Sequence, residues 1–413
     1  MSQEFIEKGY EVVEHHEKAD IYVINTCTVT NMSDRKSRQM LRRVKELNPN
    51  SIVIACGCYV QVAKDEVAKI EDIDLILGNN EKKNIVEHLE QYQKDKKRQL
   101  EIEDLMQQRE FIEFGDVTYT EKTRAVVKIQ DGCDRFCSYC IIPYARGRVR
   151  SRKPEGIISE ITKIAQEGIK EVVITGIHVA SYGKDFKENY GLIDLLEDLN
   201  KIEGIERIRL SSIEPLILDE QFINRLSKLE KICHNFHLSL QSGCDETLKR
   251  MNRRYNTEQF KTVVNLIRNT YKDAILTADV IVGFPGETEE EFEKTYKFLE
   301  DVKFYKTHVF KYSPRKGTKA AVMENQIDGN VKEQRSKKLI ELSNNFEKEY
   351  NESYIGKTVE VLWEEEKEGS YKGHTQNYLL AYYKPEKGDM NLENKITKAN
   401  CISAESDHII VEI

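Results

Sequence analysis

The stretch Asp131-Gly132-Cys133-Asp134-Arg135-Phe136-Cys137-Ser138-Tyr139-Cys140 carries three cysteines in a loop that follows the apolar run 125–129. Three residues separate the first two cysteines and two residues separate the last two. Thiolates this close in sequence converge on one small metal centre. An iron–sulfur cluster usually takes four cysteines, so a triplet with no fourth nearby predicts a cluster with one iron open to an exogenous ligand. An open coordination position indicates a catalytic site.

Two other interpretations fit the spacing alone. The cysteines could form a zinc knuckle that lacks one ligand, or they could be buried thiols that bind no metal. The three-then-two spacing with an aromatic residue, Tyr139, directly before the last cysteine resembles the signature of the radical S-adenosylmethionine (radical SAM) superfamily. This resemblance implies that Cys133, Cys137 and Cys140 are cluster ligands and catalytic residues.

Length and composition describe a globular chain of several domains. The 413 residues predict two to four domains at about 150 residues each. There is no secretory signal and no apolar run of about 18 residues, so we expect a cytoplasmic protein without membrane contact. Nine cysteines in such a chain favour metal binding or catalysis over disulfides. The net charge of −8 excludes a protein that binds nucleic acid through an overall positive charge, so RNA contact requires local basic patches.

Residues 1–95 alternate apolar runs with helical patterns. Strands are predicted at residues 20–27, 51–58 and 74–78. One basic helix is predicted at residues 33–46. This alternation predicts a doubly wound parallel sheet, whose ligands bind at the carboxyl ends of the strands. Cys27 and Cys58 end two strands and are placed to share a metal site, although two core cysteines fit equally well. Cys56 should share the sheet face of Cys58 and be packed within the sheet.

A linker and a second α/β domain follow. Residues 96–122 have mixed charges and no sustained apolar period, which predicts the linker. Beyond it, six apolar runs alternate with amphipathic helical patterns and end near residues 129, 176, 211, 241, 283 and 312. Six strand–helix units predict a partial (β/α)6 barrel over residues 123–352, two units short of a closed eight, with an opening for a large substrate.

Polar residues and glycines follow these strands, at the end of a barrel that carries active sites. The candidates for binding a cofactor there are Tyr139, Gly176, Ser211, Glu214, Gln241, Gly283, Tyr312 and Arg315. Each of these residues alone fits an ordinary turn or a solvated side chain. Because such residues follow all six predicted strands, together they favour a binding site. Gly176 and Gly283 would let the backbone approach a cofactor closely, while Glu214 and Gln241 can hydrogen-bond ribose hydroxyls or an amino group.

Two segments suggest contact with RNA. The basic run 144–153 directly follows the cysteine loop. Such runs are usually solvated, but guanidinium groups between small residues also suit phosphate, and we expect Arg146, Arg148 and Arg150 to bind RNA. Residues 353–413 show short alternating runs that predict a small β-barrel. Small barrels often bind RNA through aromatic and basic groups, whereas the acidic residues here fit a structural cap equally well.

The order of these parts resembles that of the methylthiotransferases, which join an N-terminal cluster domain, a radical SAM barrel and a C-terminal TRAM domain. The motifs that carry the resemblance are residues 25–30, the cysteine loop with Pro143 and Arg146-Gly147-Arg148, and residues 241–243, 283–287 and 312–315. Residues 176–178 and 373–378 look closest to the branch that acts on N6-threonylcarbamoyladenosine in tRNA.

The resemblance implies two [4Fe–4S] clusters, S-adenosylmethionine as a cofactor, and a monomer that acts on tRNA with an electron donor such as a flavodoxin or ferredoxin. Cys133, Cys137 and Cys140 would hold one cluster, and Cys27 and Cys58 would belong to the other. The implied reaction transfers a methylthio group to C2 of N6-threonylcarbamoyladenosine next to the anticodon. The same chemistry on isopentenyladenosine or on a ribosomal protein, and a non-catalytic iron–sulfur RNA-binding protein, remain alternatives.

The start of the chain departs from the family pattern. The N-terminal cluster of the family takes three cysteines, the first in a Gly-Cys motif near the start of the domain, whereas this sequence has no cysteine before Cys27. The chain also begins inside a predicted helix, residues 4–8, rather than in a strand. We therefore expect an N-terminally truncated domain with an incomplete second cluster.

Overall fold

The computed structural model describes all residues except 114, 116–122 and 386–390, and it divides into two compact units. The first unit contains Met1–Thr118, Asp131–Arg152 and Ser313–Val322, and the second contains the rest of the chain. The three-cysteine loop thus belongs to the same compact unit as the N-terminal segment. Most of residues 114–122, which belong to the predicted linker, lie outside the described residues.

The first unit is built on a four-stranded parallel sheet in the order β1-β2-β3-β4. Its strands are β1 (Ile21–Thr26), β2 (Ile52–Gly57), β3 (Leu75–Leu77) and β4 (Gln99–Glu101). The first three confirm the predicted strands, whereas β4 corrects the predicted linker: three residues are too short to show a period, and pairing with β3 makes the strand. Within the described residues this strand order has no reversal of the kind that defines a doubly wound sheet.

Helices cover both faces of this sheet. The helices and remaining short elements of the unit are α1 (Ser2–Glu7), α2 (Asn31–Leu47), α3 (Cys58–Val62), α4 (Lys64–Val67), η1 (Glu81–Asn84), α5 (Ile85–Asp95), α6 (Ile142–Arg146), β6 (Arg150–Ser151) and η4 (Lys319–Val322). Leu41 of α2 packs on one face, and Leu89 of α5 packs on the other. The Thr30 hydroxyl starts α2 by accepting a hydrogen bond from the Ser33 amide at 3.1 Å.

The second unit contains six parallel strands, as the sequence predicts. They are β5 (Arg124–Asp131), β7 (Glu171–Gly176), β8 (Arg207–Leu210), β9 (Asn235–Gln241), β10 (Ile275–Val282) and β11 (Lys306–Lys311). They pair in the orders β5-β7-β8 and β9-β10-β11. Isolated bridges from Ile208 to Ile232 and from Ile213 to Leu238 join the two groups, so neighbouring strands in sequence are neighbours in space.

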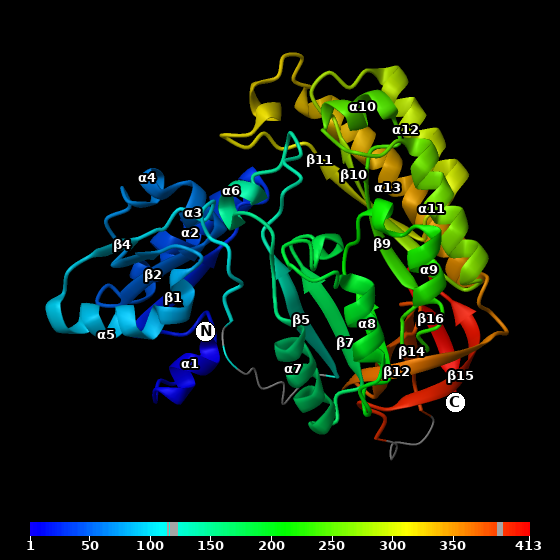
Figure 1. The fold of residues 1–413 in the computed structure, drawn as a ribbon, viewed down its shortest axis with the longest axis horizontal. Coiled ribbons are helices and arrows are strands. Elements are labelled where there is room, and N and C mark those ends of the chain that lie inside the picture. Colours follow the sequence, from blue (N-terminus) through cyan, green and yellow to red (C-terminus); the bar gives the residue numbers. More distant parts are fainter. Residues whose placement is uncertain (114, 116–122, 386–390) are drawn as a thin grey trace. The chain divides into compact units, whose positions relative to one another are not determined.

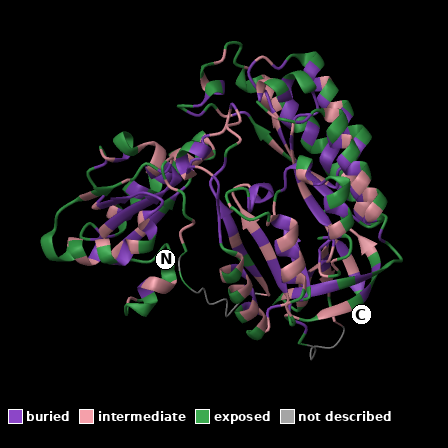
Figure 2. Ribbon diagram, in the orientation of Figure 1, coloured by how far each residue is buried: buried purple, intermediate pink, exposed green. Residues whose placement is uncertain are grey.

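Amphipathic helices cover one face of these strands (Figure 1). The helices are α7 (Pro154–Gln166), η2 (Val179–Ser181), α8 (Leu192–Asn200), η3 (Pro215–Ile217), α9 (Glu220–Leu226), α10 (Asp245–Arg250), α11 (Thr257–Thr270), α12 (Glu289–Val302) and α13 (Gly329–Glu352). Residues such as Ile161 of α7, Phe260 of α11 and Leu238 of β9 form the core between them. Buried and half-buried residues alternate along β9 (Figure 2). His237 and Ser239 are among the half-buried residues, so they lie on the face without helices.

The C-terminal segment forms a closed five-stranded barrel, in the order β12-β13-β14-β16-β15. The strands are β12 (Thr358–Lys367), β13 (Ser370–Thr375), β14 (Leu380–Tyr383), β15 (Ile396–Ala404) and β16 (Ile409–Glu412). Trp363 is fully buried in its core, and its indole N–H donates to the Thr397 hydroxyl at 2.8 Å. The predicted small β-barrel is therefore confirmed.

Buried charges attach this barrel to the amino ends of the parallel strands. Arg207, at the start of β8, donates to the carbonyl oxygens of His374 and Glu360, both at 3.0 Å. Arg209 lies 4.5 Å from the centre of the Tyr378 ring and pairs with the fully buried Glu171 at 2.8 Å. The barrel therefore closes the end of the strands opposite to the one that carries the predicted cofactor site.

Glu171 is expected to stabilise this junction strongly. Replacing it with glutamine leaves the buried Arg209 without its ion pair, and the free energy of unfolding should fall by about 3–5 kcal/mol in urea denaturation. The exposed pair of Glu206 with Lys170, at 2.8 Å, provides the control, because Glu206→Gln should cost less than about 1 kcal/mol. Equal losses in the free energy of unfolding for Glu171→Gln and Glu206→Gln would show that the buried ion pair stabilises the protein no more than the exposed one.

Acid should weaken the same junction. Burial alone would raise the pKa of Glu171, but attraction to Arg209 and Arg124 lowers it to about 2. Because this folded-state pKa lies below that of an unfolded glutamate, the stabilisation is complete above about pH 5 and is lost as the pH falls toward 2.

No helix in the described part of the chain has both the length and the apolar character needed to cross a bilayer.

Candidate metal centres and strand-end site

The cysteine loop is closed by close backbone contacts with the segment that follows it. The Cys133 amide donates to the Gly147 carbonyl oxygen at 3.0 Å. Gly132 has a φ of +72°, and a Cβ added there would lie 1.8 Å from the Arg148 carbonyl oxygen. Only glycine fits at this crossing, so Gly132 is required for the loop to close.

Turns shape the backbone of the loop between its three cysteines. The Cys140 amide donates to the Cys137 carbonyl oxygen at 2.9 Å, and Phe136 adopts a left-handed φ of +46° between the first two cysteines. The Arg135 amide points at the Cys133 sulfur from 3.5 Å. Cys133 is buried at the base of the loop, while Cys137 and Cys140 are half-buried. Partly accessible thiols with an amide aimed at sulfur suit a cysteine-ligated cluster.

Cys58 lies differently from the prediction. Gly57 has a φ of +105° and a Cβ there would lie 2.3 Å from the Thr26 carbonyl oxygen, so β2 ends at Gly57 and Cys58 opens α3. Alternation along the strand therefore does not carry over from Cys56 to Cys58, which corrects the expected shared face. Cys56 is fully buried among apolar side chains, and this burial raises the pKa of its thiol.

Cys58 is surrounded by hydrogen-bond donors. Arg146 Nε donates to Cys58 Sγ at 3.1 Å, and Asn79 Nδ2 lies 3.8 Å from the same sulfur. Arg146 also pairs with Asp131 at 3.6 Å. Burial lowers the pKa of the Arg146 guanidinium, but attraction to Cys58, to Asp131 and to Cys27 raises it above its ordinary value.

These contacts bring the two groups of cysteines together in the first unit. Arg146 contacts Cys58, and the next residue, Gly147, accepts the hydrogen bond from Cys133. Cys27 is exposed just after β1 and interacts electrostatically with Arg146. One short segment therefore lies between two candidate metal centres.

The arginines of the basic run have different environments. Arg150 is only 2% exposed and lies 3.7 Å from the Asp131 carboxylate, and Arg146 is turned inward to Cys58. Arg146 and Arg150 thus contact groups of the protein itself, and the RNA-binding role expected for them stays a prediction. Arg148 has a side chain that is 44% exposed, pairs with Asp134 at 3.2 Å and lies over the Phe136 ring.

Arg315 supports the segment after Cys27. Its guanidinium donates to Thr28 and Asp34 at 2.5 Å and to Asn31 at 2.7 Å, and the residue is only 5% exposed. These three partners all belong to the first unit. Arg315 therefore stabilises this segment, and the cofactor contact expected for it stays a prediction.

In the second unit, residues after β7, β8 and β9 form a polar group. The Glu214 carboxylate is buried between His178 Nε2, at 3.4 Å, and Arg253, at 3.8 Å. His178 is held by a hydrogen bond from its amide to Gln130 Oε1 at 2.7 Å and by contact with Ser181 Oγ at 2.7 Å. The carboxylate is thus oriented and charge-compensated.

Three further predicted residues lie at these strand ends. Gln241 adopts a left-handed φ of +68°, a strained conformation for this residue type that is often found at binding sites. Ser211 Oγ is a buried atom that makes no hydrogen bond. A Cβ added at Gly176 would lie 3.0 Å from Gln130, so glycine lets these strands pass closely. Tyr139, the remaining aromatic candidate, is half-buried in the cysteine loop of the first unit.

Gly283 is approached closely by a side chain of the protein itself, and the cofactor contact expected for it stays a prediction. A Cβ there would lie 2.3 Å from the Lys332 side chain of α13, which fills the space and donates to the Tyr312 carbonyl oxygen at 3.2 Å. Tyr312 is 5% exposed, its hydroxyl has no hydrogen-bond partner, and burial raises its pKa to about 12. The close approach expected at Gly283 is therefore made by a lysine of the protein itself.

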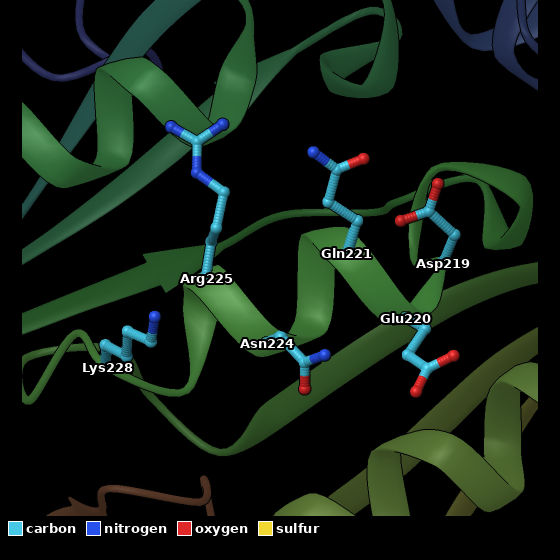
Figure 3. A pocket seen from close by; sticks show the side chains of 6 residues that line it. All are labelled: Asp219, Glu220, Gln221, Asn224, Arg225 and Lys228. Atoms are coloured by element: carbon cyan, nitrogen blue, oxygen red, sulfur yellow. The ribbon is translucent and has the colours of Figure 1, made fainter.

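Sequence reasoning missed Asn79, Asp131 and Arg253 as parts of these sites. Asn79 and Asp131 lie at or just after the ends of predicted strands, so the strand-end rule could have found them. Arg253 gives no such signal. A surface pocket beside α9 contains none of the predicted site residues: its lining is Asp219, Glu220, Gln221, Asn224, Arg225 and Lys228 (Figure 3).

Comparison with known proteins supports the domain order. The radical SAM superfamily profile matches residues 127–299, and an uncharacterized protein family, UPF0004, matches residues 1–78. The threonylcarbamoyladenosine tRNA methylthiotransferase MtaB of Bacillus subtilis is 41% identical over 97% of this chain and 90% of its own length. The enzyme of that name from Aquifex aeolicus is also 41% identical, over 92% of this chain and 91% of its own length.

Another similar protein is named for a different substrate. A tRNA-2-methylthio-N(6)-dimethylallyladenosine synthase of Clostridium botulinum is 37% identical over 97% of this chain and 91% of its own length. Among solved structures, the radical S-adenosylmethionine methyltransferase TsrM of Kitasatospora setae covers 74% of this chain and 67% of its own, with 15% identity and a TM-score of 0.54. This last similarity concerns the fold alone.

Proposed function

Because the chain belongs to the family of tRNA methylthiotransferases with a radical SAM domain, we propose that it transfers a methylthio group to C2 of N6-threonylcarbamoyladenosine next to the anticodon of tRNA. The observation that carries the proposal is the meeting of two cysteine groups at the Arg146–Gly147 segment. Similarity of 41% to two enzymes named for this substrate supports the choice of nucleoside. Similarity of 37% to the synthase of Clostridium botulinum makes N6-dimethylallyladenosine the second candidate substrate.

Two iron–sulfur clusters divide the chemistry in this proposal. Cys133, Cys137 and Cys140 hold the first, and Cys27 and Cys58 belong to the second. When bound, the first supplies the electron that cleaves S-adenosylmethionine reductively, and the second supplies the sulfur that is transferred. A radical route is required because the aromatic C–H bond at C2 is neither acidic nor electrophilic enough for polar catalysis. The electron comes from a donor such as a flavodoxin or ferredoxin.

Residues of the protein shape the cysteine loop and bind and orient S-adenosylmethionine in this proposal. Gly132 and Gly147 allow the close backbone approaches that close the cysteine loop. Glu214 and Gln241 are proposed to bind the ribose hydroxyls and amino group of S-adenosylmethionine, and Ser211 offers a further hydroxyl whose hydrogen-bonding capacity is unused. The contacts of Glu214 with His178 and Arg253 hold its carboxylate in place, so it can accept hydrogen bonds without reorganising.

The C-terminal barrel is proposed to be a TRAM domain that contacts tRNA. Its surface carries Tyr382 and His408, whose ring centres are 4.8 Å apart, and aromatic rings of this kind stack on bases. Deleting residues 355–413 would expose the buried Arg207 and Arg209, so point substitutions are the better test. The protein is proposed to act as a monomer in the cytoplasm, where its tRNA substrate is found.

Arg148 should contribute to tRNA binding. Arg148→Ala removes one exposed cation, and we expect weaker binding of tRNA and a plot of log affinity against log salt whose slope falls by about 1. Filter binding at several salt concentrations measures both. Lys228→Ala, at the exposed pocket beside α9, is the matched control and should leave the slope unchanged. Equal slopes for the wild type and Arg148→Ala would remove Arg148 from the RNA interface.

A further inference from the structure

Three polar side chains, one from each of β9, β10 and β11, form a cluster on the face of these strands that carries no helix. His237 Nε2 lies 3.1 Å from the Asp279 carboxylate, and the centres of the His237 and His308 rings are 5.4 Å apart. The parallel register places Asp279 directly beside His308 on the neighbouring strand. The cluster lies entirely within the second unit, away from both cysteine groups.

The packing of β11 against α13 decides which of its side chains face away from the helices. Thr307 is buried, its amide donates to Ser343 Oγ of α13 at 2.9 Å, and Val309 packs against the apolar core. Successive side chains of a strand point to opposite faces, so His308 and Phe310 point away from α13. Both are exposed, Phe310 to 49%. This face therefore offers an imidazole and an aromatic ring, two residues apart on one strand.

The two histidines of the cluster differ in their hydrogen bonds. His237 Nδ1 lies 2.8 Å from Thr277 Oγ1 and its Nε2 contacts Asp279, so both ring nitrogens have partners. Within the part of the chain that the structure describes, His308 makes no hydrogen bond. Burial and the neighbouring His237 lower the pKa of His308, so its ring is neutral near pH 7 and has one donor and one acceptor nitrogen. His308 is therefore available to a ligand.

We propose that His308 binds the threonylcarbamoyl group of the substrate nucleoside and so selects that substituent over an apolar one. The inference rests on the proposed function, in which N6-threonylcarbamoyladenosine is the substrate. A threonylcarbamoyl group carries a carboxylate, a hydroxyl and a urea, which can accept a hydrogen bond from His308 and donate one to it. A dimethylallyl group is a hydrocarbon. It would take water away from His308 and Asp279 without replacing the lost hydrogen bonds, which weakens binding.

The positions of these residues along the strands suit such a substrate. Gln241, which is proposed to bind S-adenosylmethionine, is paired with Val280 of β10. His308 is paired with Asp279, the residue before Val280, so it lies just inside the strand ends that carry the proposed cofactor residues. Phe310 lies about 7 Å nearer the carboxyl end of β11 than His308, at about 3.3 Å per residue. In this proposal the adenine base stacks on Phe310, and its N6 substituent extends inward to His308.

The test measures how strongly the reconstituted full chain prefers one N6 substituent. Anticodon stem-loop RNAs carry N6-threonylcarbamoyladenosine, N6-dimethylallyladenosine or unmodified adenosine at the same position, and filter binding gives a Kd for each. The wild type should bind the threonylcarbamoyl RNA most tightly. In His308→Leu the ratio of the Kd for the dimethylallyl RNA to the Kd for the threonylcarbamoyl RNA should fall about tenfold, because the threonylcarbamoyl RNA loses a hydrogen bond.

Two further variants separate substrate recognition from a merely structural role. His234 is the matched control, because it precedes the amino end of β9 and its ring contacts the Asp273 carboxylate at 2.8 Å. His234→Leu removes a similar contact at the other end of the strand and should leave the ratio of Kd values unchanged. His308→Gln keeps one hydrogen-bond donor and one acceptor at the site, so it should retain part of the preference that His308→Leu loses.

The possible results distinguish this inference from the proposed function. If the wild type methylthiolates N6-threonylcarbamoyladenosine while His308→Leu keeps the wild-type ratio, the inference is overturned and the proposed function stands. An equal fall of the ratio in His234→Leu would also overturn it. If His308→Leu does not fold, His308→Ala takes its place and the same ratio decides. A wild-type chain that forms no methylthiolated nucleoside on the threonylcarbamoyl RNA would refute the proposed function, and with it this inference.

Discussion

Replacement of Cys137 by alanine is expected to abolish cleavage of S-adenosylmethionine while the fold survives. Cys137 lies half-buried in a loop outside the apolar cores, so its loss leaves no large cavity. Without it the loop has two thiols for a cluster that needs three. Formation of 5′-deoxyadenosine by the reduced, reconstituted protein should fall more than about a thousandfold, about 4 kcal/mol in activation free energy.

A second cysteine provides the control for this result. Cys401 is 2% exposed in the core of the C-terminal barrel, and Cys401→Ala should keep full cleavage. Circular dichroism should show the same secondary structure for Cys137→Ala and the wild type. Normal formation of 5′-deoxyadenosine by Cys137→Ala would contradict the assignment of the catalytic cluster.

Replacement of Cys58 by alanine should separate the two halves of the reaction. Cleavage of S-adenosylmethionine should persist, because the loop cysteines are intact, whereas methylthio transfer to tRNA should fall more than about a thousandfold. The iron content should fall by the share that belongs to one cluster. Quantifying 5′-deoxyadenosine and the methylthiolated nucleoside in the same reaction measures both halves.

Cys56 is the matched control for Cys58. It lies two residues away but is packed with Ile54 and Leu77, so Cys56→Ala should lower stability without removing transfer. Loss of transfer in Cys56→Ala, with transfer retained in Cys58→Ala, would make Cys56 the ligand and refute the geometry around Arg146.

Strands were predictable where apolar residues gather in a run bounded by polar or glycine residues. The parallel strands β1 to β3 and all six strands of the second unit follow this rule. β4 could not be found in this way, because its three residues, Gln99–Glu101, have no period of their own and become a strand only by pairing with β3. Tertiary pairing decided that element.

The sequence could identify the cysteines as candidate ligands, but it could not predict the direction in which each arginine side chain points. Spacing alone marks Cys133, Cys137 and Cys140. By contrast, Arg146 and Arg148 have the same chemistry and lie two residues apart, yet the turn at Gly147 sends the first to Cys58 and leaves the second exposed. Charge in a sequence shows that a cation is present, whereas the backbone turn decides whether it meets a thiol, a carboxylate or solvent.

Glycine motifs were ambiguous for a similar reason. Gly283 sits at a strand end, as a cofactor-binding glycine would, but the space beside it holds Lys332 from a helix that begins 46 residues later in the chain. No local pattern around Gly283 indicates which atoms approach it. Gly132 could be interpreted better, because its neighbours in the cysteine loop already require a tight crossing.

The most direct test of the account is mass spectrometry of the nucleosides from tRNA treated with the reconstituted chain, reductant and S-adenosylmethionine. The tRNA should carry N6-threonylcarbamoyladenosine in one reaction and N6-dimethylallyladenosine in the other. We predict that the 2-methylthio derivative forms on N6-threonylcarbamoyladenosine and that 5′-deoxyadenosine forms with it. A derivative formed only on N6-dimethylallyladenosine, or 5′-deoxyadenosine without any methylthiolated nucleoside, would contradict the proposed function.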